Sequence, residues 1–106
     1  REEIHTSLDE VSASIPLFKI QIFAINRELS LDSELFKGYK NISFEVDGNL
    51  HKYMIGANED YYEILRLKEE LKQEFPEAFI VAFKNGQRMN TGEAVKEFVK
   101  KKRKAM

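Results

Sequence analysis

The side chains that most often carry catalysis are few in this sequence. It has no cysteine and only two histidines, His5 and His51, with no neighbours that would complete a metal site or a Ser–His–Asp arrangement. The acidic pair Glu69-Glu70 falls on an expected solvated face and lacks the opposed geometry of paired catalytic carboxylates. The five glycines are scattered and do not have the spacing of a phosphate-binding loop. The sequence therefore predicts no catalytic residues, no metal and no cofactor.

Residues that suit ligand binding lie in two alternating stretches, 17–25 and 50–55. In the first, Gln21 and Phe23 share a face with Lys19, and the opposite face is apolar. In the second, the residues that share the outer face are Leu50, Lys52 and Met54. Apolar side chains rimmed by an amide and cations are typical of a binding surface, although any exposed sheet face can carry such residues.

The elements that position these residues follow from periodicity and turn signals. Strands are expected at 17–25, 42–46, 50–55 and 78–83, and Asp47-Gly48 predicts a hairpin between the second and the third. Both faces of 78–83 are apolar, so the sequence leaves open which side Phe79 faces. Helices are expected at 30–36 with Ser30 as N-cap, at 60–75 with a capping box of Asp60 and Glu63, and from Thr91 onward.

The order of these elements predicts an α+β fold of the ferredoxin-like (RNP-like) βαββαβ type. Part of the strand at 17–25 also recurs 33 residues later, which indicates two strand–helix–strand halves. The simplest closed arrangement is a four-stranded antiparallel sheet in the order 4-1-3-2. Two helices then cover one face, a C-terminal helix is added, and the other face stays open to solvent or ligand.

The composition fits one domain, because 106 residues are too few for two independent cores. Residues 1–14 are polar and are predicted to be a linker, 15–99 the domain and 100–106 a basic tail. Residues 91–106 hold six cations and two anions and so carry a charge of +4. Because the net charge of the chain is −1, the other residues together carry −5. This acidic body is a poor match for nucleic acid. No run approaches the roughly 18 apolar residues of a membrane span, so no membrane insertion is expected.

Three motifs, in order, resemble the SPOR domain, the sporulation-related repeat. They are LFKIQI at 17–22, KYMIG at 52–56 and EAFIVAFKNG at 77–86, and the resemblance covers roughly 15–99. More narrowly, NEDYY at 58–62 through FPEAF at 75–79 is similar to the C-terminal SPOR-type domains of N-acetylmuramoyl-L-alanine amidases from Bacteroides-like bacteria.

The resemblance implies a module that binds peptidoglycan glycan strands, preferring strands stripped of their peptides. Gln21 and Lys52 match family residues that matter for binding. Leu50 stands where an aromatic can sit, and Phe79 matches an apolar residue of the last strand. Phe23 departs from the usual glycine, and it can either stack on a sugar ring or partly fill the site.

The resemblance also implies a wider setting. The expected location is the periplasm or cell envelope. The expected role is in cell division, where the module targets to the septum a cell-wall amidase attached upstream of Arg1. The alternative is a protein–protein or regulatory module on the same fold, with the basic helix at 91–104 as its contact.

Overall fold

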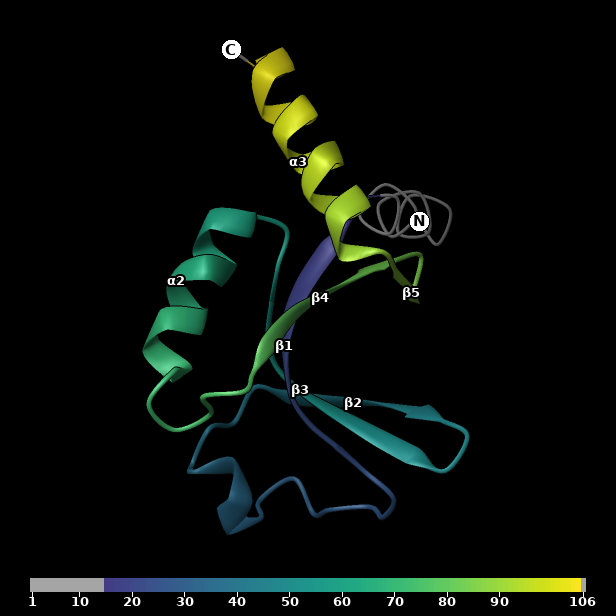
Figure 1. Cartoon of the computed structure of the whole chain (residues 1–106), viewed down its shortest axis with the longest axis vertical. Coiled ribbons are helices and arrows are strands. Elements are labelled where there is room, and N and C mark those ends of the chain that lie inside the picture. The colour runs from purple at the N-terminus through teal and green to yellow at the C-terminus, as the bar shows by residue number, and fades with distance from the viewer. Residues whose placement is uncertain (1–14, 106) are drawn as a thin grey trace, which may run out of the picture.

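A curled antiparallel sheet organises residues 15–105, which are the part of the chain that the computed structural model describes (Figure 1). The predicted linker, residues 1–14, lies outside the described residues. The strands follow the order β2-β3-β1-β4-β5, and every neighbouring pair is antiparallel. Their bounds are β1 (Leu17–Ile25), β2 (Ile42–Asp47), β3 (Leu50–Asn58), β4 (Phe79–Lys84) and β5 (Gln87–Met89).

The predicted α+β class is confirmed, but the predicted number of four strands is wrong. The fifth strand, β5, forms because Asn85 and Gly86 both adopt a positive φ, 55° and 77°. That backbone twist suits a two-residue hairpin, and it turns the chain back along β4 to pair Arg88 with Phe83.

The predicted helix at 30–36 is a single turn of 3-10 helix, η1 (Glu34–Phe36). Its N-cap is Ser33, whose Oγ accepts a hydrogen bond from Leu35 N–H at 3.2 Å. The hydroxyl of Ser30, the expected cap, donates to the Asp32 carboxylate instead. Phe36 anchors the turn, since it is 1% exposed and packs on Tyr53.

Two longer helices, α2 (Tyr61–Leu71) and α3 (Thr91–Ala105), pack on one face of the sheet. Asp60 caps α2, because its side chain accepts a hydrogen bond from Tyr62 N–H at 2.9 Å, and this half of the predicted capping box is present. The side chain of Glu63, which would form the other half, instead lies 3.4 Å from Arg66 in an ion pair. The helix ends at Leu71, before Phe75 and Pro76. The buried core between the helices and the sheet consists of Phe18, Ile20, Ile55, Ile64, Leu71, Phe75, Ala82 and Ala94.

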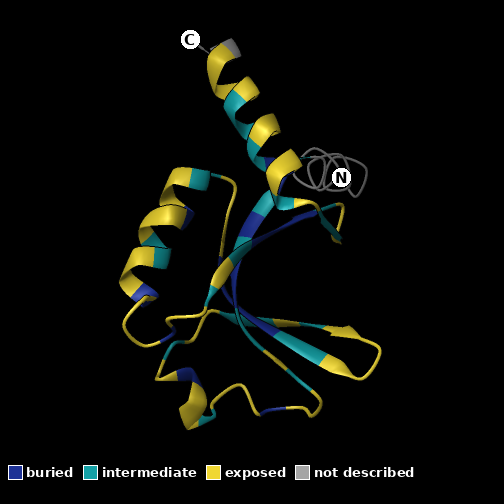
Figure 2. Cartoon of the chain, in the orientation of Figure 1, coloured by how far each residue is buried: buried dark blue, intermediate teal, exposed yellow. Residues whose placement is uncertain are grey.

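Only the first half of α3 packs on the domain. Phe98 lies 5.1 Å from Tyr62 and 6.3 Å from Phe18, ring centroid to ring centroid, whereas residues 100–103 are exposed. Figures 1 and 2 show the helix continuing past the sheet, so its basic end projects away from the body. Among residues 15–105, no helix combines the length and the apolar character needed to span a bilayer.

Candidate functional site

The face of the sheet opposite α2 and α3 carries most of the polar side chains of the strands. Residues paired directly across neighbouring antiparallel strands share a face, and the register pairs Gln21 with both Met54 and Phe79. We call this side the concave face, because the outer strands curl toward each other over it. Its residues include Leu17, Lys19, Gln21, Ser43, Glu45, Asp47, Leu50, Lys52, Met54, Phe79, Val81, Phe83 and Arg88.

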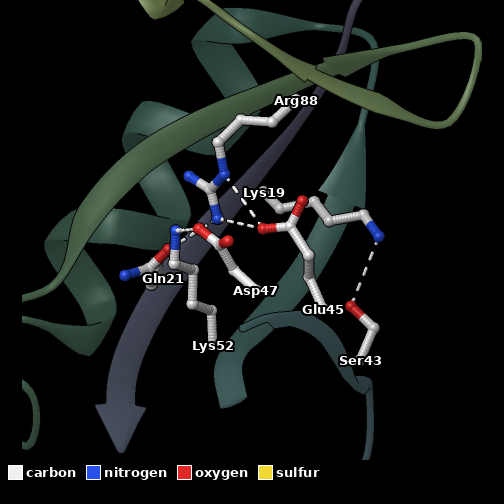
Figure 3. A network of polar contacts seen from close by, with 7 residues as sticks. All are labelled: Lys19, Gln21, Ser43, Glu45, Asp47, Lys52 and Arg88. Carbon is white, nitrogen blue, oxygen red and sulfur yellow. Dashed lines mark hydrogen bonds and ion pairs between the residues drawn. The ribbon is translucent and has the colours of Figure 1, made fainter. Parts of the chain in front are cut away.

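Arg88 connects three strands across the concave face (Figure 3). Its Nη2 donates to Gln21 Oε1 at 2.8 Å and to Glu45 Oε1 at 2.7 Å, and its Nε donates to the same Glu45 oxygen at 3.0 Å. Because β5 and β2 are the two edges of the sheet, these contacts close the face over its central strand β1. Gln21 is consequently only 7% exposed, with its buried carbonyl oxygen satisfied by the guanidinium.

A second ion pair lies beside the first, near the turn between β2 and β3. Lys52 Nζ donates to Asp47 Oδ2 at 2.9 Å. This hydrogen bond and the charge of Lys52, with a smaller effect from Arg88, hold the pKa of Asp47 below its ordinary value. The concave face therefore contains three cations, Lys19, Lys52 and Arg88, and two carboxylates.

Phe83 is the apolar base of this polar cluster. Lys19 Nζ lies 5.1 Å and Arg88 Cζ 5.3 Å from its ring centroid, which are cation–π distances. Lys19 also donates to Ser43 Oγ at 3.3 Å. Beside them is a cleft of about 520 Å³, lined among others by Lys19, Met54 and Phe83. The cleft also contains the carboxylates of Glu45 and Glu59, so it presents polar groups of both signs beside apolar atoms, which suits a ligand that has hydroxyl groups and an apolar face.

The structure brings five of the six site residues predicted from the sequence onto the concave face. Phe79 is 50% exposed and Leu50 39% exposed, at the positions paired with Gln21 and Asp47. Met54, in contrast, is 1% exposed. The register also answers the question left open for 78–83, since it puts Phe79 on the concave face, opposite the helices.

The predicted placement of Phe23 on the open face is wrong. A β-bulge in β1 leaves Gln21 opposite Met54 but Phe23 opposite Tyr53, with Ile22 as the extra residue. Phe23 therefore packs on the helix side, with its ring centroid 6.0 Å from that of Phe36 and 5.9 Å from that of Phe75. Ala24, which strict alternation would place on the apolar face opposite Gln21, is exposed for the same reason.

The exposed apolar patch expected from Phe23, Leu50 and Met54 does not form, and polar contacts occupy the centre of the face instead. Sequence reasoning missed the two residues that make these contacts, Glu45 and Arg88. The available signal was Asn85-Gly86, a dipeptide typical of tight hairpins, which predicts a further strand after it.

Within residues 15–105, no three His, Cys, Asp or Glu side chains lie close enough together to hold a metal ion. His51 packs beside the rings of Phe44 and Tyr53, and its Nδ1 is buried without a hydrogen-bond partner in the described part of the chain. Comparison with protein-family models, curated proteins and solved structures finds no match to the chain.

Proposed function

We propose that this chain is a non-catalytic module that binds peptidoglycan glycan strands on its concave face. The observation that carries the proposal is the shared face of Gln21, Lys52, Leu50 and Phe79, all four named by the SPOR resemblance. We take β1 to β4, with η1 and α2 in the two crossovers, as the counterpart of the SPOR-type βαββαβ arrangement, to which β5 is an addition.

The chemistry of the face supports a polysaccharide ligand. Sugar rings offer an apolar side, which suits the exposed ring of Phe79, and hydroxyl groups, which suit the lysines and Arg88. Phe79 takes the stacking role that the sequence suggested for Phe23. A shallow sheet surface gives modest affinity, on the order of a micromolar Kd, which suffices for a module that raises the effective concentration of an attached enzyme on the wall.

The deciding experiment is co-sedimentation of the chain with purified sacculi, intact or stripped by an amidase. We expect stronger retention on stripped sacculi. Phe79→Ala and Lys52→Ala should each weaken it about fivefold to tenfold, or about 1–1.4 kcal/mol. Leu31→Ala and Lys72→Ala are the matched controls, because both residues are exposed and lie outside the concave face. Absence of retention on both kinds of sacculi would overturn the proposal.

The proposal extends, through the resemblance, to an attached N-acetylmuramoyl-L-alanine amidase that the module carries to the division septum. A fluorescent fusion of the chain exported to the periplasm tests this extension. We expect a septal band that Lys52→Ala weakens. A uniform envelope signal from a variant that still binds stripped sacculi in vitro would contradict septal targeting.

A second candidate is a protein–protein or regulatory module that uses α3. The observation in its favour is the exposed cationic run 100–103, which projects beyond the sheet. Deleting residues 100–106 separates the two candidates, because this deletion leaves the concave face untouched. Glycan binding that survives the deletion while binding to a protein partner is lost would favour the second candidate.

A further inference from the structure

We propose that Arg88 binds a carboxylate of the ligand, and that Glu45 occupies the place of this carboxylate in the free protein. The inference rests on the proposed function and specifies its ligand class: a glycan with acidic sugars rather than a neutral one. Three features of the site carry it. They are the unused donors of Arg88, the geometry of its bond to Glu45, and the charge of the surrounding face.

The guanidinium of Arg88 is held in place but is not saturated. Arginine has five N–H donors, and the hydrogen bonds of Arg88 use only Nε and Nη2. The two N–H groups of Nη1 have no hydrogen-bond partner among the described residues. The ring of Phe83 on one side and the amide of Gln21 fix the orientation of the group, so little conformational entropy is lost when a ligand binds.

Glu45 is a replaceable partner for this guanidinium. Both of the donors that reach Glu45 point to one oxygen, Oε1, whereas a guanidinium binds a carboxylate best through two parallel bonds to both oxygens. The side chains of Arg88 and Glu45 are 29% and 27% exposed. This partly buried pair stabilises the free protein modestly, and a ligand carboxylate that accepts two parallel bonds from Arg88 replaces the attraction that Glu45 supplied, so the exchange costs little.

The charge of the face favours an anion once Glu45 is displaced. Lys52 and Lys19 flank Arg88, and these three cations outnumber the two carboxylates Glu45 and Asp47, so the face keeps a net positive charge when Glu45 moves off the guanidinium. Hydrolysis of the muramoyl–alanine amide leaves a free lactyl carboxylate on each muramic acid, where the intact strand has an amide. Arg88 therefore recognises the chemical group that distinguishes a stripped strand from a peptide-bearing one.

The test compares three preparations of the same sacculi: intact, amidase-stripped, and amidase-stripped with the carboxylates then converted to amides by carbodiimide and ammonia. We expect the chain to bind the second preparation at least tenfold more tightly than the third. Glu45→Gln should raise affinity for the second preparation several-fold and leave the third unchanged. Arg88→Gln should abolish the difference between the two.

The matched control is the ion pair of Lys84 and Glu97. Its atoms Nζ and Oε1 are 2.9 Å apart, and it joins β4 to α3 on the helix side of the sheet. Glu97→Gln and Lys84→Gln should leave all three affinities unchanged. Equal binding to the stripped and the amidated preparations would overturn the role of Arg88 while glycan binding stands. Binding to none of the three would instead overturn the proposed function. Glu45→Gln keeps the test decisive even where Arg88→Gln lowers stability, since it leaves the guanidinium in place.

Discussion

Arg88 and Glu45 belong to opposite edge strands of a five-stranded sheet, yet Arg88 Nη2 lies 2.7 Å from Glu45 Oε1. A flat sheet would hold two edge residues several strand spacings apart, about 4.8 Å per spacing. The contact therefore requires the strong curl seen in Figure 1 and helps to maintain it. It also covers Gln21 on the central strand, so the same bond shapes the concave face and satisfies a buried amide.

Replacing Arg88 should destabilise the fold. Arg88→Met keeps the aliphatic stem but removes the ion pair and leaves Gln21 Oε1 without its donor, and we expect a loss of about 1–2 kcal/mol in the free energy of unfolding. Urea denaturation followed by circular dichroism measures it. Lys84→Met is the control, with an expected loss below about 1 kcal/mol because its pair with Glu97 covers no buried polar group. A zero coupling energy in the Arg88/Glu45 double-mutant cycle would contradict this reading.

The Asp47 carboxyl should titrate at a lower pH than an ordinary aspartate. Its folded-state pKa lies below the unfolded value because Lys52 donates a hydrogen bond to it, so its contribution to stability is present above the unfolded pKa and is lost as the pH falls through the folded one. An NMR titration of the side-chain carboxyl carbon measures the midpoint. Lys52→Ala should raise this midpoint and Lys72→Ala should not. An unchanged midpoint in the Lys52 variant would show that the ion pair does not persist in solution.

Of the two glycines in β3 and its hairpin, Gly48 and Gly56, we expect Gly56 to tolerate replacement by alanine least. Its φ is +77°, and an added Cβ would lie 2.7 Å from Leu67 Cδ2 on α2. We expect Gly56→Ala to cost about 2–3 kcal/mol, from left-handed strain of about 1–2 kcal/mol and the displacement of Leu67. Gly48 also has a positive φ, +61°, but an added Cβ there would have no atom within 4 Å. Gly48→Ala therefore measures the backbone strain without a steric clash. Equal thermal denaturation midpoints for the two variants would contradict a tight contact between β3 and α2.

The buried ring of Phe36 should hold the long connection between β1 and β2. Phe36 is 1% exposed and packs on Phe23 and Tyr53, so Phe36→Ala should lower the free energy of unfolding by about 3–5 kcal/mol. The neighbouring Leu35 is 45% exposed, and Leu35→Ala should cost less than about 0.5 kcal/mol. Hydrogen exchange at 26–40 should accelerate in the first variant only. Similar stability of the two variants would mean that this connection is not anchored through Phe36.

The parts of the fold that the sequence predicts correctly depend on local signals. Asp47-Gly48 marks the hairpin between β2 and β3, and Asp60 marks the start of α2. The shared face of Gln21 and Lys52 was also predictable, because alternation holds over short stretches of a strand. For 30–36, the local signal was misleading. Ser30 has the residue type of an N-cap, but the chain there is positioned by Phe36 and by Leu29, whose N–H donates to Tyr53 Oη, and these contacts span distant residues.

The errors at the site have two physical causes. A β-bulge adds one residue without any clear mark in the sequence, so Phe23 and Ala24, which follow it in β1, were assigned to the wrong faces. The contact of Arg88 with Glu45 joins residues 43 positions apart and depends on the curl of the whole sheet, which periodicity does not encode. The hairpin dipeptide at Asn85 could have revealed β5 but not the partner of Arg88.

The extra residue in β1 also divides the strand into two halves whose alternation is out of phase, so that side chains of equal parity lie on opposite faces of the sheet. Side chains before it, such as Lys19 and Gln21, lie on the concave face, whereas Phe23 beyond it packs in the interior. Under the proposed function, weaker glycan binding by a Phe23 variant would therefore report a damaged interior and not the loss of a ring that stacks on a sugar. Because this one residue sets the face of Phe23, the insertion or deletion of a single codon in β1 would move the aromatic ring from the interior to the concave face. Substitutions would need several coordinated changes to do the same.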